Sequence, residues 1–452
     1  MRRARNILLA LAAACAVAAP AHAQTVTLDQ AIEMSLHADP RIKEKEQLVR
    51  AAQALLAEVR GHDGWQLGAN AFIGLAPSVN GGIFANGAQS GTVLRSDGAH
   101  LHGVTPWAHL EFTLVKPLYT FGKLRNYGIA AKGNIAVQQA ETRVTQADIV
   151  YDTKRAYYGY LTARETHRFL EEINGKLKNT VASVQSNLKD DRGNATQADL
   201  YALQTAQGLL GKYLAQSVAV ESIALDGLKV LTGVGMGGDL QIADTRLAPA
   251  PLPAQSLDAL QNRALADRPE MAALEAGLQA RRALVAAKKA EDWPDIYAGV
   301  AGLGNYTPGR DKLNNPYIYD PFNSYGLTPV VGVKWNISFD VNRAKVDHAQ
   351  AELEALQYKK QYALEGIPFQ VAEAYANAQA NRKSITELGD GAAAARRWVV
   401  ANLADYNAGF TSAEKVAEAL KNYVLLQADY LKSIYDYNLD VARLAKLTGE
   451  PR

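Results

Sequence analysis

Apolar positions recur along the chain with two periods, one typical of helices and one typical of strands. In one segment they are spaced by three or four residues, at Leu170, Ile173, Leu177, Val181, Val184 and Leu188, and a shorter series follows at Val346, Ala349, Leu353 and Leu356. This is the heptad spacing of a coiled coil. The stretches 123–188 and 343–406 around them contain only one proline, Pro368. The pattern predicts two helices of roughly 65 residues, each about 100 Å long at about 1.5 Å per residue.

Strict alternation in other segments predicts strands. From 107 to 115, Leu110, Phe112 and Leu114 alternate with His109, Glu111 and Thr113, and the segment 331–339 alternates in the same way. Each follows a weaker strand rich in glycine and alanine, at 65–75 and 296–306. One apolar and one polar face suit a strand between lipid and water, although a half-buried strand of a soluble sheet alternates too. The residues expected to face lipid are Leu110, Phe112, Leu114, Val333, Trp335 and Ile337.

Four strands cannot close a barrel. The strands of each pair are joined by long polar loops, at about 77–105 and 307–327, an asymmetry typical of outer-membrane barrels. An open sheet edge in lipid would leave backbone groups unpaired, so several chains must share one barrel. Three copies would supply twelve strands.

The chain carries an internal repeat. Leu28-Asp29 and Pro40 recur 229 positions later as Leu257-Asp258 and Pro269, and Leu231-Thr232-Gly233 recurs 216 positions later. Thr27 and Ser256 are expected to cap the first helix of each copy. We therefore predict a first repeat at 24–233, a linker at 234–255 and a second repeat at 256–449, each in the order helix, hairpin, long helix, turn, helix.

The first 23 residues have the pattern of a signal peptide. Three arginines precede an apolar run, which ends at Ala21-His22-Ala23 before Gln24. The single cysteine of the sequence, Cys15, lies inside this segment, so cleavage would leave a mature chain without thiols. In the alternative, Cys15 is the lipidated first residue of a lipoprotein. No later stretch is long and apolar enough for a membrane-spanning helix.

Composition and motifs narrow the function further. With 48 basic and 46 acidic residues the chain lacks the excess of cations typical of nucleic-acid binders. Hydrophobic residues make up 48% of it, which excludes intrinsic disorder. The glycine-rich run at 233–238 lacks the lysine of a phosphate loop. Because we find no catalytic constellation, the sequence predicts no enzyme, no cofactor and no metal site.

With these features in place, the chain resembles the outer-membrane efflux protein family, the TolC-like exit ducts. The resemblance rests on Thr27–Ile32 with Asp39-Pro40, on Lys116–Lys123, and on the two Leu-Thr-Gly helix ends. It rests also on the two turn segments Gly193–Leu200 and Tyr406–Ser412. It implies a mainly α fold with a membrane β-barrel: a long coiled-coil α-helical barrel plus four β-strands per chain, with a shared 12-stranded barrel in a homotrimer.

The same resemblance implies passive export across the outer membrane of a Gram-negative bacterium, with a helical tunnel in the periplasm. An inner-membrane transporter and a periplasmic adaptor, or membrane fusion protein, would be the partners, in a tripartite efflux pump or a type I secretion system. Such ducts are not enzymes. The exported substrate stays open between drugs, metal ions and polypeptides.

Site residues are carried over only where they match the family. Gly193, Thr196, Gly409 and Thr411 would form the periplasmic tip turns where the adaptor docks. Asp199 and Tyr406 would form a hydrogen bond that helps to lock the closed tip. Relatives that prefer cations carry acidic residues six and nine positions after the second glycine, whereas this chain has Lys415 and Glu418. A ring of alternating charge would weaken that preference.

One other class of protein fits the same patterns. A soluble periplasmic scaffold or adaptor would use the helices as a coiled coil and fold the hairpins into a small β domain. Whether the alternating apolar side chains face lipid or a protein core distinguishes the two interpretations.

Overall fold

The computed structural model describes residues 24–78, 103–190, 195–310 and 319–450. The segments 1–23 and 191–194 lie outside this part, so the predicted signal peptide, Cys15 and Gly193 do too. Within the described part, no helix is both long and apolar enough to cross a membrane. The chain divides into two compact units.

The helices and strands recur in one order. The first series is α2 (Leu28–Ala38), α3 (Pro40–Gly61), β2 (Gln66–Pro77), β3 (Val104–Tyr119), α4 (Lys123–Lys189) and α5 (Gln197–Leu231). The second is α6 (Leu257–Asp267), α7 (Pro269–Ala290), β5 (Asp295–Tyr306), β6 (Tyr325–Lys334), α8 (Phe339–Asn407) and α9 (Ala413–Leu447). Two short strands, β1 (Gln24–Val26) and β4 (Leu240–Ile242), pair in parallel. The domain boundaries given above stay predictions.

Local sequence explains where the first helices begin and break. The Thr27 side chain caps α2 in a capping box with Gln30, and Ser256 caps α6 through the backbone N–H of Ala259. Both expected caps are confirmed. The single helix that the sequence predicted before each hairpin is instead two helices. Pro40 and Pro269 disfavour helical backbone at the residue before them, and they begin α3 and α7.

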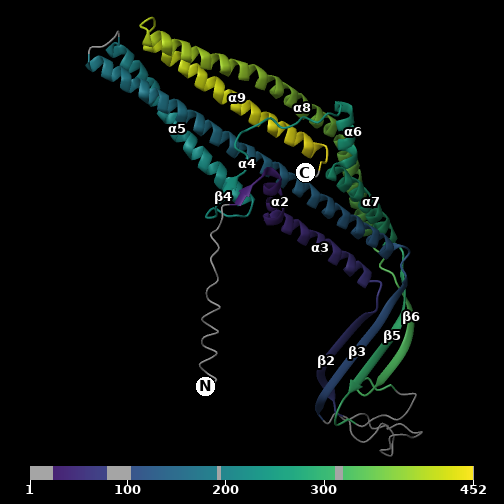
Figure 1. Cartoon of the computed structure of the whole chain (residues 1–452). Coiled ribbons are helices and arrows are strands. Elements are labelled where there is room, and N and C mark those ends of the chain that lie inside the picture. Colours follow the sequence, from purple (N-terminus) through teal and green to yellow (C-terminus); the bar gives the residue numbers. More distant parts are fainter. Residues whose placement is uncertain (1–23, 79–102, 191–194, 311–318, 451–452) are drawn as a thin grey trace, which may run out of the picture. The chain divides into compact units, whose positions relative to one another are not determined.

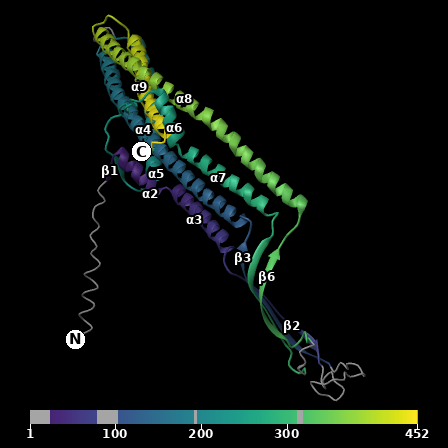
Figure 2. The ribbon, with the colours of Figure 1, turned by 90° about the vertical axis from the view of Figure 1, so that its right-hand side faces the viewer.

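The first unit comprises residues 1–47, 139–272 and 360–452. Figures 1 and 2 show its long helices as two pairs, α4 beside α5 and α8 beside α9. The predicted heptad residues of α4 are buried, with exposed fractions between 2% and 8% from Leu170 to Val184. They pack against Leu200, Leu203 and Leu210 of α5 and against Ala413 of α9. The coiled-coil seam is therefore one of the cores of this unit, and a second is built around Tyr157, Leu228 and Ile434.

The second unit comprises residues 48–138 and 273–359 and contains the four-stranded antiparallel sheet. The strands lie side by side in the order β2, β3, β5, β6 (Figure 1). Along the β3–β5 pair, a Cβ at Gly302 would lie 2.2 Å from the Phe112 ring. Glycine in β5 thus leaves room for a neighbouring aromatic ring, which explains the weak strand pattern there. The second heptad series also packs, with Ala349 and Leu353 against Leu278 and Val285 of α7.

An ion cluster in the second unit fixes the turn from α7 into β5. The Glu291 carboxylate accepts hydrogen bonds from the Tyr127 hydroxyl, from Lys288 at 2.9 Å and from Lys345 at 3.2 Å. Burial alone would raise the pKa of Glu291, but these donors outweigh burial and lower it to about 2. The carboxylate is therefore charged at any physiological pH and joins α4, α7 and α8 where the strands begin.

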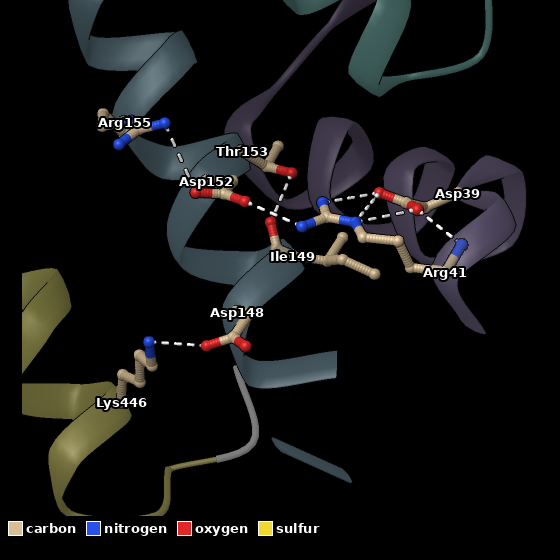
Figure 3. Close-up of polar contacts among 8 residues, drawn as sticks. All are labelled: Asp39, Arg41, Asp148, Ile149, Asp152, Thr153, Arg155 and Lys446. Carbon is tan, nitrogen blue, oxygen red and sulfur yellow. Dashed lines mark hydrogen bonds and ion pairs between the residues drawn. The ribbon is translucent and has the colours of Figure 1, made fainter. Parts of the chain in front are cut away.

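A second cluster, in the first unit, holds the break between α2 and α3 (Figure 3). The guanidinium of Arg41 donates to both carboxylate oxygens of Asp39 and, at 3.2 Å, to Asp152 of α4. Asp39 is 7% exposed and Arg41 is 43% exposed. The hydrogen bond from Arg41 holds the pKa of Asp39 below its usual value of 3.8, against the opposing effect of burial.

We predict that Arg41→Gln lowers the free energy of unfolding by about 1 kcal/mol, because the buried Asp39 carboxylate loses its guanidinium donors and keeps only the backbone N–H of residue 41. The midpoint of thermal unfolding should fall by about 2 °C in a chain of this size. Arg155→Gln is the matched control, since Arg155 is 57% exposed and meets Asp152 only at 3.5 Å. Because the folded-state pKa of Asp39 is lowered, its contribution is present above pH 3.8 and is lost as the pH falls further. A defect that persists undiminished at low pH would contradict this account.

Candidate functional site at the helix turns and the sheet face

One carboxylate in the first unit caps two helices at once. Asp199, 8% exposed, accepts the backbone N–H of Thr196 at 3.0 Å and its hydroxyl at 2.7 Å through Oδ2. Its Oδ1 accepts the backbone N–H of Ala413, the first residue of α9, at 2.8 Å. The adjacent Ser412 makes no side-chain cap of its own. Asp199 therefore satisfies donors at the N-termini of both α5 and α9.

These hydrogen bonds keep the carboxylate ionised. Burial would raise the pKa of Asp199, but the donors from Thr196 and Ala413 outweigh burial and lower it. A negative charge at two helix N-termini is also favoured by both helix dipoles. The link between α5 and α9 is thus an electrostatic one as well as a hydrogen bond.

Asp199 and Tyr406 form no hydrogen bond within this single chain, and their bond in a closed, assembled duct stays a prediction. Both carboxylate oxygens are occupied by Thr196 and Ala413. The Tyr406 hydroxyl is buried and has no hydrogen-bond partner among the described residues. Burial raises the pKa of Tyr406, and the nearby charge of Asp199 raises it further. Sequence reasoning missed the Ala413 donor because a backbone N–H leaves no signal in a residue pattern.

The remaining turn residues surround a cavity of about 710 Å³ lined by Thr196, Asp199, Tyr406, Gly409 and Thr411, among others. Gly409 adopts a φ of +80°, so its residue type is required by the backbone. It ends α8 by donating its N–H to the Tyr406 carbonyl. Phe410 follows with 85% of its surface exposed. The counterpart Gly193 lies outside the described residues.

Lys415 and Glu418 lie on one exposed face of α9. Their charged groups are 3.5 Å apart, and their side chains are 61% and 53% exposed. An exposed pair of this kind contributes little to stability. The pair brings two opposite charges together within one chain, and its effect on ion preference stays a prediction.

The register of the sheet separates an apolar face from a polar one. Leu110, Phe112 and Leu114 of β3 share a face with Val333 of β6, because paired residues of neighbouring strands point the same way. In the described strands, the only charged residue on this face is Lys116. The opposite face carries His109, Glu111, Asn305 and other polar residues. Large apolar side chains remain exposed on the first face, including Ile73 at 83% and Val331 at 78%.

Two of the six residues expected on the strands lie beyond them. The sequence predicted a strand to Phe339, but β6 ends at Lys334, which pairs with Asp295 at the start of β5. The next residue of the partner would be Pro294, which has no N–H for a strand ladder. Trp335 and Ile337 follow the strand and are 56% and 53% exposed. The Trp335 indole instead donates to the Asp292 carbonyl at 3.0 Å.

Comparison with known proteins agrees with these features. Residues 260–450 match the outer membrane efflux protein family. The predicted resemblance to this family is confirmed. Comparison with curated protein sequences found no match.

Solved structures of outer-membrane channels share the fold of the whole chain. The channel protein CusC has a TM-score of 0.76 at 17% identity, over 93% of this chain and 92% of CusC. The CmeC outer membrane channel of Campylobacter jejuni has a TM-score of 0.75 at 14% identity, over 94% of this chain and 86% of CmeC. The open-state MtrE outer membrane channel of Neisseria gonorrhoeae has a TM-score of 0.68 at 17% identity, over 93% of this chain and 88% of MtrE. The mainly α fold with a four-stranded antiparallel sheet is the fold of these channels.

We predict that Asp199→Ala frees the first turn of α9. Loss of a helix cap costs about 1 kcal/mol, so hydrogen exchange in the peptide that contains the Ala413 amide should accelerate by about fivefold. Glu418→Ala removes an exposed carboxylate of the same helix and should leave this exchange unchanged. Equal exchange in wild type and Asp199→Ala would show that Asp199 does not hold α9.

Proposed function

We propose that three copies of this chain form an exit duct of the bacterial outer membrane. The observation that carries the proposal is the exposed apolar face of the sheet, combined with two strand edges that have no partner in the described part of the chain. The family match of residues 260–450 supports it. Substrates would pass through passively, delivered by an inner-membrane transporter of an efflux pump or a type I secretion system.

The apolar face fits a lipid environment better than a protein core. On the two outer strands of this face, large apolar side chains are more than half exposed along the whole strand. They are Leu67, Ile73 and Leu75 of β2 and Leu327, Val331 and Val333 of β6. Water would be a poor solvent for so large a continuous apolar surface. The polar face, with His109, Glu111 and Asn305, would line a water-filled lumen.

Closure of the sheet favours a trimer. β2 and β6 each pair on one side only, and an open edge in lipid costs several kcal/mol for each unpaired group. β6 of one copy beside β2 of the next would continue the antiparallel alternation. Three copies of four strands give an even, closed barrel of twelve.

The paired turns around Thr196 and Gly409 are where we place the contact with a periplasmic adaptor. They expose backbone, small polar side chains and the Phe410 ring, around the cavity that contains Asp199 and Tyr406. In this proposal both residues belong to the closed state, with Asp199 bonded to the Ala413 N–H within its own chain and linked to Tyr406 in the assembled duct. The tunnel is a conduit and performs no chemistry.

The alternative, a soluble periplasmic scaffold or adaptor, requires a cover for the apolar face. Within the second unit the described residues leave that face exposed. A scaffold would also have to leave two sheet edges open in water, where such edges promote aggregation. Both features are explained together by a shared barrel in lipid.

We predict that Leu110→Asp weakens assembly in the outer membrane, because a carboxylate on the lipid face of a barrel is destabilising, although by less than the about 2–4 kcal/mol that an arginine or lysine costs near the middle of the bilayer. The readout is the oligomer that survives mild detergent without boiling and collapses to monomer on heating. Thr113→Asp places the same charge on the opposite face of the same strand and should assemble normally. Equal assembly of both variants, or a water-soluble monomer in wild type, would contradict the duct.

A further inference from the structure

A cavity of about 350 Å³, with largely apolar walls and a few polar and charged groups, lies where β6 ends and α8 begins. Its lining includes Lys289 of α7, Trp335, Ser338, Asn342 and Arg343. None of these residues belongs to the turns or to the lumen-facing surface described above. All of them lie in the second unit, beside the exposed apolar face of the sheet.

The first turn of α8 borders this cavity and offers free donors. The Ser338 carbonyl accepts the Asn342 N–H at 2.8 Å, which places the start of the helix directly after Ser338. The backbone N–H groups of residues 339–341 find no acceptor among the described residues. Such an uncapped N-terminus carries partial positive charge and favours an anion.

Asn342 gives an independent sign of a missing ligand. The residue is 8% exposed and lines the cavity. Its side-chain amide makes no hydrogen bond to a described residue, and the residue borders the cavity, where a ligand would reach the amide. An oxygen-rich group in the cavity would accept from its NH₂.

Two cations stand at the same cavity without partners. Lys289 and Arg343 are exposed, and neither forms an ion pair with a described residue. By contrast, Lys288 and Lys345 nearby are both bonded to Glu291. The one carboxylate in the lining is Asp292, whose carbonyl holds the Trp335 indole. The balance of charge in the lining is therefore positive.

The surroundings of the cavity are apolar on one side. Trp335, Ile337 and Phe339 are exposed at 56%, 53% and 82% and continue from the last apolar residue of β6. Exposed tryptophan beside cations is typical of the boundary between acyl chains and headgroups. An anion that carries hydrocarbon fits this setting better than a free inorganic anion.

We propose that this cavity binds the phosphate of a glycerophospholipid, with its acyl chains along the apolar face of the sheet. Arg343 and Lys289 would pair with the phosphate, and Asn342 and the free N–H groups of α8 would donate to its oxygens. The proposal rests on the proposed membrane location of the sheet. It adds a specific lipid site to a surface that otherwise contacts lipid without selectivity.

The test is a titration of the purified oligomer in an uncharged maltoside detergent with phosphatidylglycerol, followed by native mass spectrometry. Wild-type protein should bind this lipid saturably, with one tight site per chain. Lys289→Gln with Arg343→Gln should weaken binding by about fivefold for each cation removed. Asn342→Leu, of similar size, should weaken it as well. The matched control, Lys132→Gln with Lys359→Gln, removes two exposed cations outside the cavity lining and should leave binding unchanged.

Separate arms identify the ligand. An uncharged diacyl glycolipid should not compete, and inorganic phosphate should compete only at far higher concentration. Equal binding by the glycolipid, or equal loss in the control variant, would overturn the site. Displacement by inorganic phosphate at the affinity of the lipid would show a free-phosphate site instead. The heat-sensitive oligomer is measured separately. If it forms normally but phosphatidylglycerol does not bind as expected, only the lipid site is contradicted. If wild-type protein forms no such oligomer, both the duct and the lipid site are contradicted.

Discussion

Hydrogen bonding at the edges of one four-stranded sheet is the constraint from which the rest of the account follows. The sheet has an apolar face suited to lipid, but lipid offers no partner for the outer backbone groups of β2 and β6. In the proposed membrane setting, a single chain of this sequence would therefore be an incomplete structure. Other copies would supply the missing strands, and each would bring its own α4, α5, α8 and α9.

The same series of helices and strands occurs twice in the chain. Each half supplies a break at proline, a hairpin, a helix of more than 60 residues and a shorter return helix of 35 residues. Charged clusters hold the points at which the chain changes direction. Glu291 joins three helices at the start of β5, and Asp199 joins the first turns of α5 and α9. In both clusters, hydrogen bonds to a carboxylate outweigh the effect of its burial on the pKa.

Much of this fold could be predicted from the sequence, because periodicity reports burial directly. The heptad residues of α4 and the alternating residues of β3 are placed as expected, and so are the caps Thr27 and Ser256. The end of β6 could not be predicted from its own residues, because it depends on the partner strand, which begins after Pro294. The alternation through Trp335 and Ile337 continues past the last backbone pair.

The contacts of the turn residues could be predicted from the sequence even less well. Asp199 was identified as important from its position in a family pattern, yet its contact within the chain is with a backbone N–H at Ala413 and not with Tyr406. Such a bond joins residues 214 positions apart and does not depend on the side chain of its donor. The cavity beside Asn342 likewise arises from three segments whose individual patterns are ordinary. Tertiary packing, and not local sequence, creates both sites.

The most direct test of the central claim is a cross-link between the two open edges. Asn70→Cys on β2 and Thr328→Cys on β6, in a Cys15→Ser background without other cysteines, would be treated in membranes with a short bis-maleimide. A closed ring predicts a covalent trimer as the largest product from the double variant and no product above a dimer from either single variant. Monomers alone, or a ladder that continues beyond three chains, would contradict a barrel shared by three copies.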